Sequence, residues 1–217
     1  MLTQDQLLQA VEVEFDRTSA GAQGWANPHL DRGVTQDEYS RCLDPGKWRI
    51  LVARTEAWAN ALRRLGLARV ERVKVVDWVD EHHAAQEWDV LERLTPLNAG
   101  GVPLVFAYRN WGECDDLNWV TVGAGSPVVP VVNEPGCGCD ACDDGSQYPL
   151  DQLDDAILDI VTGGFRHLWR DDQQITLRGS SRFGLNPPDE PELTATLEDP
   201  SGWNEVVGDA WSGTGPG

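Results

Sequence analysis

Four short valine-rich segments separated by turn residues constrain the fold of this chain more than any other feature. They span residues 70–79, 104–109, 119–122 and 128–132, and each has the composition of a β-strand. The connections that follow the second and third segments are too short to contain the crossover helix that a parallel pair needs. We therefore expect these strands to pair antiparallel, as a meander.

Three further segments carry apolar residues at the spacing typical of an amphipathic helix. The first begins with a capping box from Thr3 to Gln6. The second begins with Asp44 as N-cap and Pro45 at the first helical position. The sequence predicts helices over residues 3–18, 44–66 and 149–162, a helical or irregular segment over 81–94, and one more short strand over 175–177.

These elements together predict an α+β domain over residues 1–185. Two or three helices would pack on one face of a largely antiparallel sheet of four or five strands. After residue 185 the composition changes, because Pro and Gly become frequent and seven acidic residues between Asp189 and Asp209 have no Lys or Arg among them. Such a composition favours a loosely held chain, so we expect residues 186–217 to form an acidic C-terminal tail.

The charge of the chain is unevenly distributed. The net charge is −19, and residues 110–165 contain eleven acidic residues and no Lys or Arg. Nucleic-acid binding depends on basic side chains that displace counterions from phosphates, so we expect no nucleic-acid partner. The acidic surface suits a basic protein or a small cationic ligand, or it serves solubility alone.

The sequence also bears on location. No stretch approaches the ~20 apolar residues of a membrane span, and the N-terminal residues lack the basic and apolar regions of a signal peptide. We expect a cytoplasmic protein without a membrane partner, in which thiols remain reduced.

Three of the five cysteines lie within six residues, as Cys137, Cys139 and Cys142. The spacing from Cys139 to Cys142 is the common half-site of structural zinc, which takes four ligands. Cys114, in the acidic turn that precedes the third predicted strand, is the first candidate for the fourth ligand. The alternatives for that position are Cys42, His167, Asp140 and Asp143.

The cysteine pattern leaves several interpretations open. The first is a binding or interaction module with a zinc site, and the second is a set of reduced thiols that serve only packing or a turn. The third is a thiol-disulfide redox protein that uses Cys139 and Cys142, although acidic neighbours disfavour a thiolate nucleophile. A fourth is an enzyme of unknown reaction with an acidic pocket, but the sequence contains no phosphate loop, HExxH helix or GxSxG elbow.

Trp111 and Trp119 flank the acidic turn that contains Cys114. If the meander brings this turn and the three cysteines to one end of the sheet, they would form a negative, partly aromatic cleft for a cation or an amine. Two unrelated solvated loops are the alternative. A second group has the composition of a metal site but is interpreted as a solvated strand end: Asp77, Asp80, Glu81, His82 and His83.

Several strings between about residues 35 and 170 resemble a family of uncharacterised actinobacterial proteins with a Cys-Gly-Cys-Asp-Ala-Cys-Asp motif. They are Glu-Tyr-Ser-Arg at 38–41, Asp-Pro at 44–45, Pro-Leu-Val-Phe-Ala at 103–107, Pro-Gly-Cys-Gly-Cys-Asp-Ala-Cys-Asp at 135–143 and Gly-Gly-Phe-Arg at 163–166. The resemblance implies no activity, ligand or partner. The turn over 111–117 is longer and more acidic than the family's, so the resemblance does not extend to Cys114.

Overall fold

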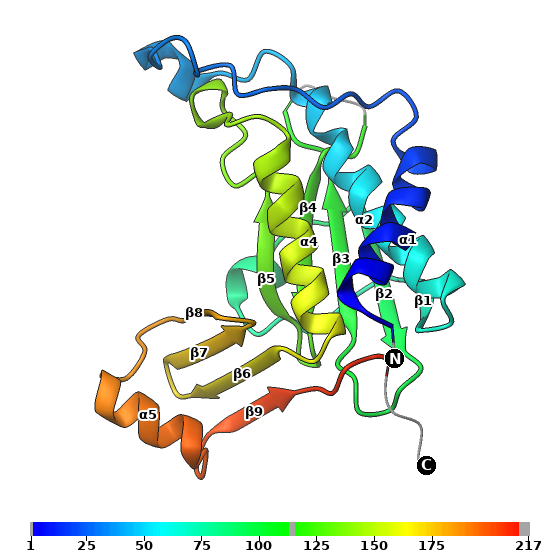
Figure 1. The fold of residues 1–217 in the computed structure, drawn as a ribbon. Helices are drawn as coiled ribbons and strands as arrows, with labels where there is room; N and C mark the ends of the chain where they lie inside the picture. Colours follow the sequence, from blue (N-terminus) through cyan, green and yellow to red (C-terminus); the bar gives the residue numbers. More distant parts are fainter. Residues whose placement is uncertain (1, 113–115, 213–217) are drawn as a thin grey trace.

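The structure, a computed structural model, describes residues 2–112 and 116–212 of the chain. Within these residues, five α-helices and two antiparallel sheets form an α+β fold (Figure 1). The predicted fold class is confirmed, and the second sheet is an addition to it. None of the described helices is both long enough and apolar enough to cross a membrane.

The first sheet is a five-stranded meander in which every strand pairs antiparallel with the next along the chain. Its strands are β1 (Ala68–Val73), β2 (Val90–Pro96), β3 (Leu104–Arg109), β4 (Trp119–Ala124) and β5 (Val129–Glu134). The antiparallel prediction was correct because two of its connections leave no room for a helix.

The prediction for residues 81–94 was wrong in part. A one-turn helix, α3 (Glu81–Ala84), begins there, but the segment then becomes β2. β2 lies between β1 and β3 and bonds to both. Pairing with two neighbouring strands outweighs the weak helical spacing of these residues, because strand stability depends mainly on cross-strand context.

Three helices lie beside the first sheet (Figure 1). They are α1 (Gln4–Thr18), α2 (Arg49–Arg64) and α4 (Gln147–Val161). α2 and α4 cover one face of the sheet and α1 packs against α2, with Trp58, Phe106 and Ile157 fully buried between these layers. The Thr3 capping box is confirmed. Asp44, however, makes no capping hydrogen bond, because a 3-10 turn over Pro45–Trp48 precedes α2.

The second sheet was not predicted beyond residues 175–177. It consists of β6 (Phe165–Arg170), β7 (Gln173–Arg178), β8 (Ser181–Phe183) and β9 (Asn204–Val207), in the order β8-β7-β6-β9. β9 and α5 (Glu190–Glu198) lie in the stretch expected to be loosely held, and Trp211 beyond them is buried. The division of the chain at residue 185 remains a prediction.

Two segments far apart in sequence meet near one end of the first sheet. The long connection between α1 and α2 lies beside the loop between β5 and α4 (Figure 1). Backbone hydrogen bonds join them, from Asp140 N to Arg41 O at 2.9 Å and from Ser146 N to Trp25 O at 3.1 Å. The loop between β5 and α4 contains the three clustered cysteines, so the α1–α2 connection supports it.

Candidate metal centre

The three clustered cysteines bring their sulfurs together at the end of β5. The Sγ atoms of Cys137, Cys139 and Cys142 all lie within 4.8 Å of one another, and Cys137 Sγ lies 3.2 Å from Cys139 Sγ. Cys139 is buried, whereas Cys137 and Cys142 are exposed. Three sulfurs this close can hold a metal ion.

A glycine and a short turn shape this loop. Gly138 has φ +74°, and a Cβ built on it would lie 2.8 Å from ring atoms of Trp111. Only glycine fits such a contact and adopts this conformation without strain. After it, the 3-10 turn Asp140–Cys142 closes with a hydrogen bond from Cys142 N to Cys139 O at 3.1 Å, which returns Cys142 toward the other two thiols.

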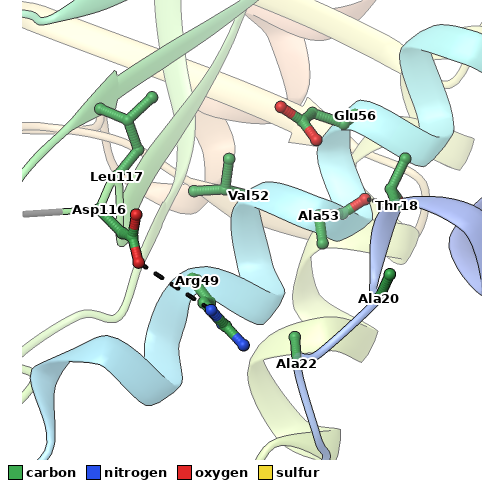
Figure 2. Close-up of a pocket in the computed structure, with 9 residues that line it drawn as sticks. All are labelled: Thr18, Ala20, Ala22, Arg49, Val52, Ala53, Glu56, Asp116 and Leu117. Atoms are coloured by element: carbon green, nitrogen blue, oxygen red, sulfur yellow. Dashed lines mark hydrogen bonds and ion pairs between the residues drawn. The ribbon is translucent and has the colours of Figure 1, made fainter.

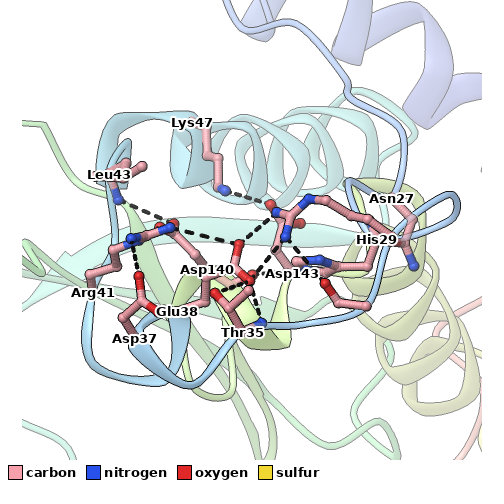
Figure 3. Close-up of polar contacts among 12 residues, drawn as sticks. Asn27, His29, Thr35, Asp37, Glu38, Arg41, Leu43, Lys47, Asp140 and Asp143 are labelled. Carbon is pink, nitrogen blue, oxygen red and sulfur yellow. Dashed lines mark hydrogen bonds and ion pairs between the residues drawn. The ribbon is translucent and has the colours of Figure 1, made fainter.

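Asp140 anchors the loop to the α1–α2 connection (Figure 3). Its carboxylate accepts hydrogen bonds from Arg41 Nε and from the backbone N–H of Leu43, both at 3.1 Å. Its carbonyl oxygen lies 2.8 Å from His29 Nε2. As a candidate fourth ligand, Asp140 is therefore already committed to a structural contact.

Asp143 is held in the same way. Lys47 Nζ lies 2.5 Å from one carboxylate oxygen, and Trp25 Nε1 and Gly145 N donate to the other at 2.8 and 2.9 Å. Burial alone would raise the pKa of Asp143, but the hydrogen bonds from Lys47 and Trp25 lower it. Neither Asp140 nor Asp143 belongs to the group of close ligand atoms, so both serve the loop's shape.

The remaining candidates for a fourth ligand differ in their surroundings. His167 lies in β6 of the second sheet, fully buried, with Nδ1 2.8 Å from Thr176 Oγ1. Cys42 lines a cavity together with Cys137 and Cys139, but its sulfur is not within the close group. Cys114 lies outside the described residues, so its role as fourth ligand remains a prediction.

Hydrogen bonding distinguishes the three clustered thiols. Burial alone would raise the pKa of Cys139, but hydrogen bonds from the thiols of Cys137 and Cys142 and from backbone N–H groups lower it. Conversely, the hydrogen bond to Cys139, together with burial, raises the pKa of Cys142 to about 12. Cys139 is thus the thiol on which negative charge is best stabilised.

Two cavities adjoin the cysteine loop. The larger, about 520 Å³, is lined by Tyr39, Ser40, Arg41, Cys42, Leu43, Pro45, Trp111, Gly112, Cys137 and Cys139. The smaller, about 250 Å³, contains Cys137, Cys142 and Glu134 in its wall. Burial raises the pKa of Glu134 to about 7.

Trp111 and Trp119 do share one end of the sheet, with ring centroids 5.7 Å apart. Trp119 is buried, and the Arg109 guanidinium lies 4.4 Å from the centre of its ring. Of the two tryptophans, only Trp111 lines the larger cavity. The described lining of that cavity contains Arg41 and no acidic residue. Residues 113–115 of the acidic turn lie outside the described residues, so the expected negative cleft beside the tryptophans stays a prediction.

A third cavity, of about 410 Å³, lies where α1 ends beside α2 (Figure 2). Glu56 and Asp116 line it, and Arg49 lies 4.0 Å from the Asp116 carboxylate. The hydroxyl in its wall belongs to Thr18 and donates to Ala53 O at 2.7 Å. Among the described residues of this lining, no nucleophile is hydrogen-bonded to a base, the arrangement that covalent catalysis requires.

The second metal-like group in the sequence serves local structure. Asp80 caps α3 through the backbone N–H of His83 and also contacts that residue's Nδ1 at 2.8 Å. Within the described parts of the chain, the three clustered cysteines are the only group of three or more His, Cys, Asp or Glu with ligand atoms close enough to hold a metal.

A model of a protein family described as a family of unknown function (DUF6226) matches residues 11–211. The match includes the cysteine loop, the second sheet and the buried Trp211. No curated protein and no solved structure matches the chain.

Proposed function

The chain belongs to the DUF6226 family of unknown function, and we propose that it is a binding or interaction module in which Cys137, Cys139 and Cys142 hold a zinc ion. The convergence of three sulfurs within 4.8 Å carries this proposal. Tetrahedral zinc with bonds of about 2.3 Å places its sulfur ligands roughly 3.8 Å apart. The thiols therefore need only small rotations to bind zinc.

The surroundings of the sulfurs support a cation. Hydrogen bonds lower the pKa of Cys139, which favours the thiolate that a metal ligand must become. Anchoring of Asp140 and Asp143 holds the loop in position before any metal binds. Such preorganisation reduces the ordering that a ligand has to impose.

Three cysteines leave one position of tetrahedral zinc for another ligand. Cys114 is the ligand that the sequence predicts, and Cys42 is the alternative that lines the same cavity as two of the cysteines. A water molecule or a partner's side chain would fill the position if neither cysteine does.

Exposed apolar side chains around the loop support an interaction role. Tyr39 and Leu43, which line the larger cavity, are 57% and 76% exposed, and Tyr148 beside the smaller one is 59% exposed. Together with the net charge of −19, they favour a basic protein segment or a small cationic ligand over nucleic acid. A reducing cytoplasm would keep the thiols available.

Elemental analysis of the untagged full-length protein tests the metal site. We expect about one zinc ion per chain, and C139S should lose it because the central sulfur is removed. C114S and C42S identify the fourth ligand, since the variant that lacks it should bind zinc more weakly. Equal zinc contents in the wild type and in a variant lacking all three clustered cysteines would contradict the proposal.

The resemblance noted above leads to one more proposal. We take the Cys-Gly-Cys-Asp-Ala-Cys-Asp motif at 137–143 to be characteristic of this family and its members to be actinobacterial. An alignment of family members tests both points. If most members lack these cysteines, the proposed metal site cannot be part of a function that the whole family shares.

A further inference from the structure

Two of the three clustered thiols are arranged for direct reaction with each other. Cys137 Sγ lies 3.2 Å from Cys139 Sγ, within hydrogen-bond distance. Cys137 is exposed and Cys139 is buried. An incoming reagent can therefore reach Cys137, and the Cys139 thiol lies 3.2 Å behind it.

The backbone between these two cysteines permits a bond. Residues two apart are separated by at most about 7 Å between Cα atoms, and a disulfide requires about 4.4–6.8 Å. Gly138, with its positive φ, makes a bend between them while its lack of a side chain leaves room for Trp111. A small adjustment of this bend brings the sulfurs to bonding distance.

Cys142 is less well placed to compete for Cys139. It ends the 3-10 turn Asp140–Cys142, and the carboxylates of Asp140 and Asp143 fix that turn on both sides. Cys137 follows Gly136, which is exposed, and precedes Gly138. Cys137 therefore lies outside the turn that these two carboxylates fix.

The larger cavity gives a small reagent access to Cys137. Its volume of about 520 Å³ lies within the ~300–1,000 Å³ typical of small-molecule sites. Both Cys137 and Cys139 line it, beside the exposed side chains of Tyr39 and Leu43. A low-molecular-weight disulfide can therefore approach the sulfur that is to be attacked.

We propose that Cys137 and Cys139 reduce small-molecule disulfides and become a disulfide themselves, a reaction separate from metal binding. The Cys137 thiol gives up its proton and attacks one sulfur of the reagent RS–SR; the S–S bond breaks, a mixed disulfide forms, and the RS⁻ that leaves takes up that proton. The Cys139 thiol then gives up its proton and attacks the Cys137 sulfur, and the second RS⁻ leaves and takes up the second proton. Two thiols are oxidised and one disulfide is reduced to two thiols.

This reaction has a consequence that rests on the proposed function. A Cys137–Cys139 disulfide removes two of the three sulfurs that would hold zinc, so oxidation releases the ion. The pair differs from Cys139 and Cys142, which the sequence alone suggested for redox chemistry.

Intact-mass spectrometry of the metal-free full-length protein with oxidised glutathione tests the inference. We expect the wild type to lose two hydrogen atoms and two of its five thiols, and to retain no glutathione. C142S, the matched control, should behave like the wild type. C137S and C139S should both lose this product, and C139S should instead accumulate one glutathione on the exposed Cys137.

Two results would overturn the inference: disulfide formation in C137S at the wild-type rate, or its loss in C142S. Circular dichroism establishes that each variant is folded. A parallel sample loaded with zinc is read with a zinc-sensitive dye. Zinc binding without a disulfide would overturn this inference alone, whereas a disulfide in a protein that binds no zinc would overturn the proposed function alone.

Discussion

His167 is a single buried side chain whose protonation the fold opposes. It is fully buried in β6, its Nε2 has no hydrogen-bond partner among the described residues, and burial lowers its pKa to about 4. An unfolded chain would bind the proton near pH 6.5. Between pH 6.5 and 4 the unfolded state therefore binds more protons than the folded state, so stability falls as the pH is lowered.

The His167→Gln variant tests this at the residue scale. The wild type should lose up to about 3 kcal/mol of unfolding free energy between pH 6.5 and 4 through this one group. The variant lacks the titrating ring. Its unfolding free energy should therefore fall by about 3 kcal/mol less than that of the wild type over the same pH range. Urea unfolding at several pH values measures the difference, and parallel curves for the two proteins would contradict the assignment.

A largely buried ion pair joins α2 and α4. Arg54 of α2 donates to both carboxylate oxygens of Asp154 in α4, at 2.8 and 2.5 Å. The indole of Trp58 donates to the same carboxylate at 2.7 Å. Arg54 also binds Glu12 of α1 at 2.7 Å, so one guanidinium joins three helices.

At the scale of these elements, Asp154→Asn should destabilise the protein by about 3 kcal/mol. The change leaves a guanidinium that is only 5% exposed without its main counter-charge. Glu12→Gln is the matched control, because Glu12 binds the same Arg54 but is 60% exposed. It should cost less than about 1 kcal/mol, and equal losses in denaturant unfolding would disprove the distinction.

For the molecule as a whole, the last described residues connect the two sheets. β9 pairs with β6 in the second sheet, and the chain then returns to the first. There Trp211 is 2% exposed, and its indole donates to Val102 O at 3.1 Å. The acidic, Pro-rich stretch is thus attached to the second sheet through β9 and to the first through Trp211.

Replacement of Trp211 by Ala should therefore destabilise the whole protein by about 3–5 kcal/mol, the usual cost of truncating a buried aromatic side chain. Leu185→Ala is the matched control, because Leu185 is 59% exposed and begins the same stretch. Thermal unfolding should show a large decrease in Tm for the first variant and almost none for the second. A small effect of both would indicate that the stretch contributes little to stability.

Local patterns determined much of this protein in advance. The short connection after residue 109 forces β3 and β4 to be antiparallel neighbours. The Thr3 capping box depends only on residues three apart. Convergence of the three cysteines was predictable for the same reason, since six residues contain them all and a glycine permits the bend.

The tertiary structure decided what depends on distant residues. β2 and β8 are stable because of the strands beside them, and their own residues signal this weakly. Asp140 and Asp143 were candidate ligands by sequence, yet they bind Arg41 and Lys47, about a hundred positions earlier. The sequence shows which residues form the cysteine loop. The contacts that hold the loop, and part of the lining of its cavities, come from the α1–α2 connection, which only folding places beside it.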